Sequence, residues 1–320
     1  MKTKLTIEQR LEIYKTRNYP DISKYLTGNK IDPLNSTMKI VIPTYQRENM
    51  ADKLTYNRIP DDLKSLTYFI SRESRTKLLK SKFPNANIIS IKDDNENIAL
   101  TRQRILELFP DNKVLMIDDL VILEQRDPNN KYYSPSHSCT DEQYHELYDW
   151  MSYLLDYVTA VGVNPRQGQN RNTDSMINFD TRLYGVYGLR TDIFNKENIR
   201  FDQLYQIDNR CSTLEDMSYN LQLLSKGYEN ILITDFINNS SHSAPGGCTE
   251  SRTLERNNAS WETLQSLYPN FIKLRVDSGK SWGGNFKNID RYEGIVSWKK
   301  VLKSYTGQLP PCYDDTYTEN

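Results

Sequence analysis

The sequence is poor in the residues that build zinc sites, disulfide scaffolds and membrane spans. It has only three histidines and four cysteines, and Cys139, Cys211, Cys248 and Cys312 lie far apart with no C-x-x-C pair. This spacing argues against a zinc module and favours free thiols in a reducing compartment. No apolar run is long enough to cross a bilayer, and Met1–Leu5 lacks a signal-peptide core. We therefore expect a cytoplasmic protein with no membrane partner.

Net charge and glycine content are also low. The chain carries 41 Lys and Arg against 42 Asp and Glu, a formal net charge of −1, so overall charge does not indicate a nucleic-acid-binding protein. There are only 13 glycines among 320 residues, whereas tyrosine reaches 22, and tyrosine suits binding surfaces. The apolar fraction of 37% is typical of a globular chain with one large or two ordinary domains.

The most informative stretch is an apolar run that ends at two carboxylates. Val114–Ile117 has the composition of a buried central strand, and Asp118, Asp119 and Leu120 follow it. In open α/β sheets, ligands bind outside the carboxyl ends of the strands. Carboxylates at that edge can hold a hard cation, which can in turn hold phosphates. The alternative is that the two acids only cap a loop.

Short apolar runs alternate with amphipathic stretches, which predicts an α/β fold with mainly parallel pairing. Strands are expected at 38–45, 67–70, 87–91, 114–117, 159–163, 183–189 and 230–236; helices at 6–14, 74–82, 97–109, 141–158 and 214–228; polar loops at 128–138 and 164–178. On the helix at 97–109, Ile98, Thr101, Ile105 and Leu108 share the expected apolar face, and Arg102 can point back toward the strand ends.

The C-terminal part has a different composition. Between residues 252 and 303, ten basic residues stand against five acidic ones, a local charge of +5, with Trp261, Trp282, Tyr292 and Trp298 interleaved. Such a segment suits a phosphate-bearing or flat aromatic partner, although a solvated surface over core tryptophans would look the same. We predict a lead-in at 1–37, a main domain at 38–245 and a basic, aromatic extension at 246–320.

Four features, taken in order, resemble the GT-A glycosyltransferases of the family 2 type. They are Ile42–Tyr45, Asn97 with Ala99, Arg102 and Arg104, Met116–Asp119, and Leu214–Met217 followed by Lys226–Tyr228 and His242. The resemblance covers roughly residues 38 to 245. It implies a GT-A, Rossmann-like sheet flanked by helices, and an inverting transfer from a UDP-sugar with a divalent metal, Mn or Mg.

The resemblance also implies a role for each matching residue. The nucleotide-sugar site would be lined by Pro43, Thr44, Tyr45, Arg47, Arg102 and Asp118. Asp118 and Asp119 would replace the family's metal-binding Asp-x-Asp, with His242 completing the metal shell. Asp216, beside Glu215, would be the catalytic base on the acceptor hydroxyl. Without the resemblance, the two acids at 215–216 would be interpreted as a helix N-terminus that complements its dipole.

More narrowly, the chain looks like the phage-type, TET-associated glycosyltransferases that modify hydroxymethylated pyrimidines in DNA. The matching segments are Gly246–Thr249 followed by Arg252, and Tyr268–Phe271 running into Lys273 and Arg275. This resemblance implies a glucose- or arabinose-type donor, duplex DNA as partner, and a target base that flips out of the stack. The sugar would shield a phage genome from nucleases inside the host cytoplasm.

One departure from the family pattern keeps other interpretations open. Leu120 stands where the family often has a further acid, so the metal site could be weak or degenerate. The alternatives are the same chemistry on a polysaccharide or protein acceptor, a non-catalytic binding protein on a degenerate scaffold, and a nucleotidyltransferase on a similar sheet. The sequence does not indicate the oligomeric state.

Overall fold

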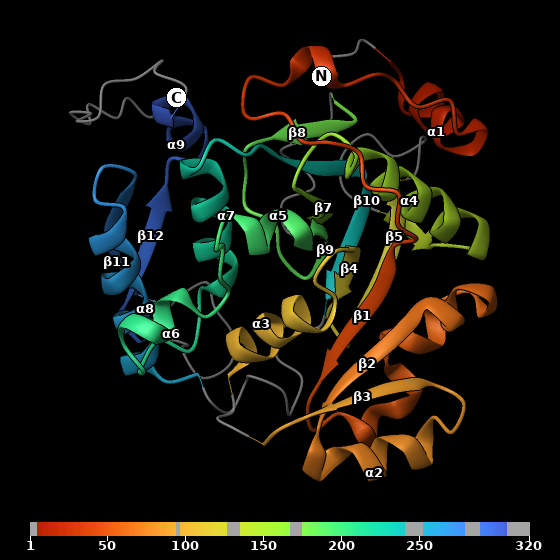
Figure 1. Cartoon of the computed structure of the whole chain (residues 1–320), viewed down its shortest axis with the longest axis horizontal. Helices are drawn as coiled ribbons and strands as arrows, with labels where there is room; N and C mark the ends of the chain where they lie inside the picture. The colour runs from red at the N-terminus through yellow and green to blue at the C-terminus, as the bar shows by residue number, and fades with distance from the viewer. Residues whose placement is uncertain are drawn as a thin grey trace.

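The computed structural model describes residues 5–93, 97–126, 135–166, 175–240, 252–278 and 289–305. A ten-stranded sheet forms its centre, in the order β3-β2-β1-β4-β9-β7-β10-β5-β6, with β8 paired to β10 (Figure 1). The strands are β1 (Lys39–Thr44), β2 (Thr67–Arg72), β3 (Asn87–Ile91), β4 (Lys113–Ile117), β5 (Val121–Arg126), β6 (Pro135–Ser138), β7 (Ala160–Pro165), β8 (Ile177–Phe179), β9 (Val186–Arg190) and β10 (Asn230–Ser240).

Strand directions confirm the predicted fold class, a mixed and mainly parallel α/β sheet. β1, β2, β3 and β4 pair in parallel, and so do β7 and β10. Tracing the antiparallel pairs shows that only β5, β8 and β9 run against the others. The carboxyl ends of β1 and β4 therefore lie side by side at one edge, as the sequence predicts.

Helices cover both faces of the sheet (Figure 1). They are α1 (Ile7–Thr16), α2 (Glu73–Lys82), α3 (Ile98–Leu108), α4 (Asp141–Leu154), α5 (Thr191–Lys196), α6 (Gln203–Ile207) and α7 (Glu215–Ser225). Along β4, Leu115 and Ile117 join the core under α1, α2 and α4, whereas Val114 and Met116 join the core under α3, α5 and α7. This alternation is the period of two that a strand buried on both faces requires.

Several sequence predictions need correction. The segment at 128–138, expected to be a loop, contains β6, and the loop expected at 164–178 contains the start of β8. The helix expected to run from 141 to 158 ends at Leu154. On α3 the expected face is confirmed only in part, because Thr101 and Ile105 are buried but Leu108 is 41% exposed, and Arg102 is buried in addition. The buried face is rotated because Arg102 reaches carboxylates at the strand ends.

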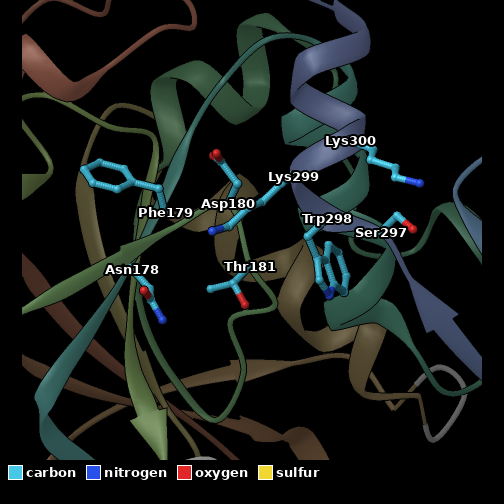
Figure 2. Close-up of a pocket in the computed structure, with 8 residues that line it drawn as sticks. All are labelled: Asn178, Phe179, Asp180, Thr181, Ser297, Trp298, Lys299 and Lys300. Atoms are coloured by element: carbon cyan, nitrogen blue, oxygen red, sulfur yellow. The ribbon is translucent and has the colours of Figure 1, made fainter. Parts of the chain in front are cut away.

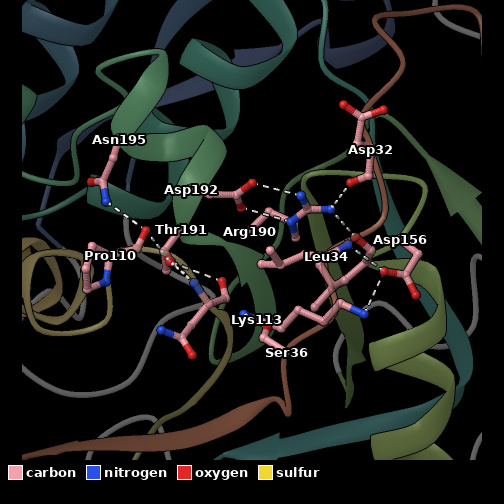
Figure 3. Close-up of polar contacts among 12 residues, drawn as sticks. Asp32, Leu34, Ser36, Pro110, Lys113, Asp156, Arg190, Thr191, Asp192 and Asn195 are labelled. Atoms are coloured by element: carbon pink, nitrogen blue, oxygen red, sulfur yellow. Dashed lines mark hydrogen bonds and ion pairs between the residues drawn. The ribbon is translucent and has the colours of Figure 1, made fainter.

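The N-terminal lead-in packs against the main sheet. The predicted capping box of Thr6 and Gln9 starts α1. Further on, the Arg190 guanidinium donates to the Asp32 carbonyl over 2.8 Å, and the backbone N–H of Leu34 donates to an Asp156 carboxylate oxygen over 3.1 Å (Figure 3). These contacts tie residues 32–34 to the amino edge of the sheet.

The C-terminal elements form a smaller unit beside α7 (Figure 1). They are α8 (Leu254–Leu267), α9 (Trp298–Tyr305) and the antiparallel pair β11 (Ile272–Asp277) and β12 (Arg291–Val296). Their apolar side chains form a third hydrophobic cluster with α6 and α7. None of the helices placed in the structure combines the length and apolarity that crossing a bilayer needs.

The attachment of α1 generates a stability prediction. The buried Tyr14 hydroxyl donates to the Asp235 carboxylate of β10 over 2.9 Å, and Arg10 lies 3.3 Å from the other oxygen. At pH 8, Tyr14→Phe should lower the free energy of unfolding by about 2 kcal/mol, because it removes a donor from a buried carboxylate. Urea unfolding measures the loss. Tyr25→Phe, at an exposed ring, is the control, and an equal effect of both changes would contradict the prediction.

Candidate functional site

The turn after β4 presents the two predicted carboxylates. The Asp118 N–H donates to the Gly185 carbonyl over 2.8 Å. Thr55 holds the other side of the turn, with its hydroxyl donating to the Asp118 carbonyl over 2.7 Å and its N–H to the Asp119 carbonyl over 2.8 Å. The Asp118 side chain is 42% exposed and the Asp119 side chain only 14%. The backbone therefore fixes one accessible and one buried carboxylate at the strand end.

Arg102 bridges the strand end to helix α7. Its guanidinium lies 2.7 Å from the Asp118 carboxylate and also donates to the Glu215 carboxylate. The same group lies 5.6 Å above the centre of the Tyr187 ring. Burial lowers the pKa of Arg102, but the surrounding Tyr187, Asp118 and Glu215 raise it well above its usual value. Arg102 is thus a permanent cation between two acids, and the prediction that it faces the strand ends is confirmed.

The segment after β1 lies against Asp119. Arg47 Nε is 3.6 Å from the Asp119 carboxylate, and the Tyr45 N–H also donates to that carboxylate. Burial nevertheless raises the pKa of Asp119 to about 7, against the lowering effect of Arg47. Between them, Gln46 has a left-handed backbone with φ of 56°. Side chains other than Gly are uncommon there, and such strain concentrates at functional sites.

The predicted nucleoside wall is largely buried in this structure. Pro43 and Thr44 are buried at the end of β1, and among the described residues the Thr44 hydroxyl has no hydrogen-bond partner. Tyr45 is partly exposed and accepts a hydrogen bond from Gln46 Nε2 over 3.1 Å. Of the four predicted residues from 43 to 47, Tyr45 and Arg47 thus contact Asp119, and Thr44 carries the unpaired hydroxyl.

The start of α7 holds the predicted catalytic pair. Leu214, just before the helix, has φ of 65°, a costly conformation for a bulky side chain, and it makes no side-chain cap. Glu215 and Asp216 are both buried, and each carboxylate is paired with an arginine from another element. Burial raises the pKa of Glu215, while Arg102 acts to lower it. These acids therefore do more than complement the helix dipole.

The partner of Asp216 is Arg182, which the sequence analysis did not single out. Arg182 comes from the loop between β8 and β9, and its Nε and a terminal nitrogen lie 2.7 and 2.5 Å from Asp216 Oδ2. No spacing or periodicity marks Arg182 in the sequence, since it is one arginine in a polar stretch. Thr55 and Tyr187 also contribute to the site, and no sequence pattern marks either of them as a functional residue.

The structure brings most of the predicted residues together. Arg102 pairs with both Asp118 and Glu215, and Arg47 pairs with Asp119. Asp216 follows Glu215 directly in the chain. His242 and the Gly246–Thr249 loop lie outside the described residues. Arg252, which follows that loop, is described and acts to lower the pKa of Glu215.

The fit of a divalent cation is partial. Asp118 and Asp119 offer hard oxygen ligands side by side, and Asp118 is accessible. Within the described ranges, no group of three or more His, Cys, Asp and Glu side chains could hold a metal ion. Each of the two carboxylates is paired with an arginine instead. A complete shell would need ligands from outside these ranges, such as His242.

A separate hollow of about 350 Å³ lies between β8 and the start of α9 (Figure 2). Asp180, Thr181, Trp298 and Lys299 are among the residues that line it (Figure 2). Phe179 of β8 pairs with Ile231 near the start of β10. The hollow therefore adjoins the amino end of β10, away from the carboxylate cluster at the carboxyl ends of the parallel strands.

Comparison with curated proteins finds relatives along most of the chain. The beta-glucosyl-HMC-alpha-glucosyl-transferases of Enterobacteria phages T2 and T6 are 24% and 25% identical over 280 residues, which are 84% of this chain and 95% of theirs. Among solved structures, the mannosyltransferase PcManGT from Pyrobaculum calidifontis, in complex with GDP-Man and Mn²⁺, is 12% identical with a TM-score of 0.44, covering 81% of this chain and 71% of that one.

The decisive match is to a family. The model of the TET-associated glycosyltransferase family matches residues 38–247, which is 210 of the 320 residues. The matched segment begins immediately before β1 and contains the whole carboxylate and arginine cluster. The chain is therefore a glycosyltransferase and belongs to the TET-associated glycosyltransferase family.

Proposed function

We propose that this enzyme transfers a sugar from a UDP-sugar, of the glucose or arabinose type, to a 5-hydroxymethylated pyrimidine in phage DNA. The observation that carries the proposal is the Arg102 bridge between Asp118 and Glu215, because it joins a strand-end ligand edge to the helix that bears Asp216. Family membership supports the reaction class, and the names of the phage relatives support an acceptor that contains HMC.

In this proposal Asp216 is the general base. The transfer breaks the bond between the anomeric carbon and the diphosphate and forms a bond to the acceptor oxygen, whose proton passes to the Asp216 carboxylate. Glu215 is buried against Arg102, so it serves to hold that cation rather than to take the proton. Asp216 pairs with a different arginine, Arg182, and so does not share Arg102 with Glu215.

The nucleotide sugar would bind where β1 and β4 end. Arg47 and Arg102 are permanent cations at this edge, and guanidinium groups bind phosphates well. Pro43, Thr44 and Tyr45 would line the nucleoside. A divalent cation, when bound, would neutralise the leaving diphosphate. Asp118, Asp119 and His242 are the proposed ligands.

The C-terminal extension at 246–320 is the proposed DNA-facing part, with 1–37 as a lead-in to the main domain at 38–245. In this extension, β11 and β12 form a separate small sheet, on which Lys273 and Arg275 are exposed. Phosphate contacts by such residues make DNA binding sensitive to salt. We place the reaction in the host cytoplasm, where the added sugar would protect phage DNA from nucleases.

A second candidate acceptor is a sugar already attached to the base. The names of the phage relatives specify an alpha-glucosyl transfer to beta-glucosyl-HMC. If this chain shares that acceptor, the new bond would form on a glucose hydroxyl rather than on the hydroxymethyl group. An α-linked product from an α-linked donor would also mean that the configuration at the anomeric carbon is retained. The direct displacement proposed above, with Asp216 as base, would invert that configuration.

A transfer assay tests the function and separates the acceptors. The enzyme is incubated with a panel of UDP-sugars and Mn²⁺ or Mg²⁺ on duplex DNA with 5-hydroxymethylcytosine, or with its β-glucosylated form, and the nucleosides are analysed by mass spectrometry. One added sugar on the first DNA, lost at high salt, is the expected result. Addition only to the second DNA would establish the second candidate. UDP release without either product would reject DNA as acceptor.

The base assignment yields a mutational prediction. Asp216→Asn should lower kcat by about a hundredfold or more, because a general base contributes at least that factor. Binding of UDP, measured by calorimetry, should change little. Asp192→Asn is a matched control, since Asp192 also pairs with an arginine, Arg190, over 2.8 Å but lies outside the site (Figure 3). Near-normal turnover of Asp216→Asn would remove Asp216 as the base.

The proposed metal ligands Asp118 and Asp119 give a second mutational prediction. Asp119→Ala and Asp118→Ala should each weaken Mn²⁺-dependent UDP binding by about tenfold or more, since even outer-shell losses at metal sites have effects of this size. Calorimetry with Mn²⁺ and with EDTA gives the metal-dependent part of the affinity. Asp61→Ala, at a fully exposed acid, should leave that part unchanged. Unchanged affinity in Asp119→Ala would exclude Asp119 from the metal shell.

A further inference from the structure

The contact between Arg182 and Asp216 joins two elements that are distant in the chain. Arg182 lies 34 residues before Asp216, and both of its hydrogen-bonding nitrogens approach the same oxygen, Oδ2, at 2.7 and 2.5 Å. Asp216 Oδ1 accepts a hydrogen bond from the Met217 N–H over 2.9 Å. The carboxylate is therefore oriented from both sides, and its side chain is only 8% exposed.

Arg182 is itself held in place. Its guanidinium lies 4.5 Å from the centre of the Tyr184 ring. On one side, Thr181 exchanges two hydrogen bonds with Asn230, of 2.9 and 2.7 Å. On the other side, the Leu183 carbonyl accepts a hydrogen bond from Tyr219 of α7 over 3.1 Å. The loop thus presents Arg182 to α7 from a backbone that is anchored before and after it.

Asp216 lies beside a second buried carboxylate, and Arg182 is the cation that contacts it. Two adjacent buried carboxylates, Glu215 and Asp216, disfavour each other's charge. Arg102 is already committed to Glu215 and Asp118, which leaves Arg182 as the direct partner of Asp216. Burial acts to lower the pKa of Arg182, but the Asp216 carboxylate raises it. The groups that act electrostatically with Asp216 are Glu215 and Tyr219 on α7, Arg102 on α3, Tyr187 on β9, and Arg182 and Tyr184 on the β8–β9 loop.

We propose that Arg182 is a positioning residue for the reaction, which keeps Asp216 ionised and holds its carboxylate in one orientation. The inference rests on the proposed role of Asp216 as the base. Because Arg182 donates to Oδ2 only, Oδ1 is left with the weaker backbone contact and is the oxygen that would accept the proton from the acceptor hydroxyl.

Two changes at Arg182 separate its charge from its geometry. Arg182→Gln should raise the pKa of Asp216 by about one unit or more, which moves the acidic limb of the kcat/KM profile to higher pH, with activity recovering above it. Arg182→Lys retains a cation but not the two-pronged contact, so the limb should stay near its original pH while kcat falls about tenfold. The KM for the donor should change little in both.

A matched control is available in the same region. Arg200 has the same exposed fraction as Arg182, 36%, and pairs with the buried Asp202 through two hydrogen bonds of 2.8 and 2.9 Å. Arg200→Gln removes an equivalent ion pair that does not touch Asp216. It should leave the acidic limb in place, even if it lowers the melting temperature as much as Arg182→Gln does.

A readout without turnover keeps the inference independent of the acceptor. Carbon-13 NMR of labelled aspartate carboxylates, with Asp216 assigned through Asp216→Asn, measures its pKa in each variant. An unchanged pKa in Arg182→Gln would overturn the inference. If Arg182→Gln does not fold, an unaltered kcat in Arg182→Lys would do so. Full activity of Asp216→Asn would instead reject Asp216 as base, whatever the NMR shows for Arg182.

Discussion

Four carboxylates gather at one edge of the sheet, and each of them pairs with one of three arginines. Asp119 faces Arg47, Asp118 and Glu215 share Arg102, and Asp216 faces Arg182. Removing an ion from water costs several kcal/mol unless a partner and hydrogen bonds compensate for the loss. The acids among them that are buried, Glu215 and Asp216, therefore depend on their arginine partners. Because the partners come from the segments after β1 and β4, from α3 and α7, and from the β8–β9 loop, the ion pairs also fix how these elements meet.

Backbone strain lies directly beside these pairs. Gln46 precedes Arg47, and Leu214 precedes Glu215, and both have left-handed backbones that L side chains seldom adopt. Such conformations persist only where the surroundings determine them, and here the surroundings are the ion pairs. The same rigidity suits the proposed reaction, since a base and its donor-binding cations must be oriented before the substrate arrives.

Helix α7 connects the main sheet to the C-terminal unit. Tyr219 and Leu223 belong to the core under the sheet, whereas Met217, Leu221 and Leu224 belong to the cluster formed with α8 and α9. The helix that begins with Glu215 and Asp216 is therefore packed on both sides. In the proposed function, this places the base at the junction between the donor edge and the part of the chain that would face DNA.

Although it missed β5, β6 and β8, the sequence alone determined most of the alternating strands and helices of the main domain, the strand end at Asp118 and Asp119, the inward direction of Arg102 and the family. Each of these depends on local periodicity or on residues close together in the chain. Only the tertiary structure decided which arginine pairs with which acid, that Arg182 belongs to the site, and which face of α3 is buried. Partners 16 to 113 residues apart leave no local pattern, because their contact exists only after the strands and helices have come together.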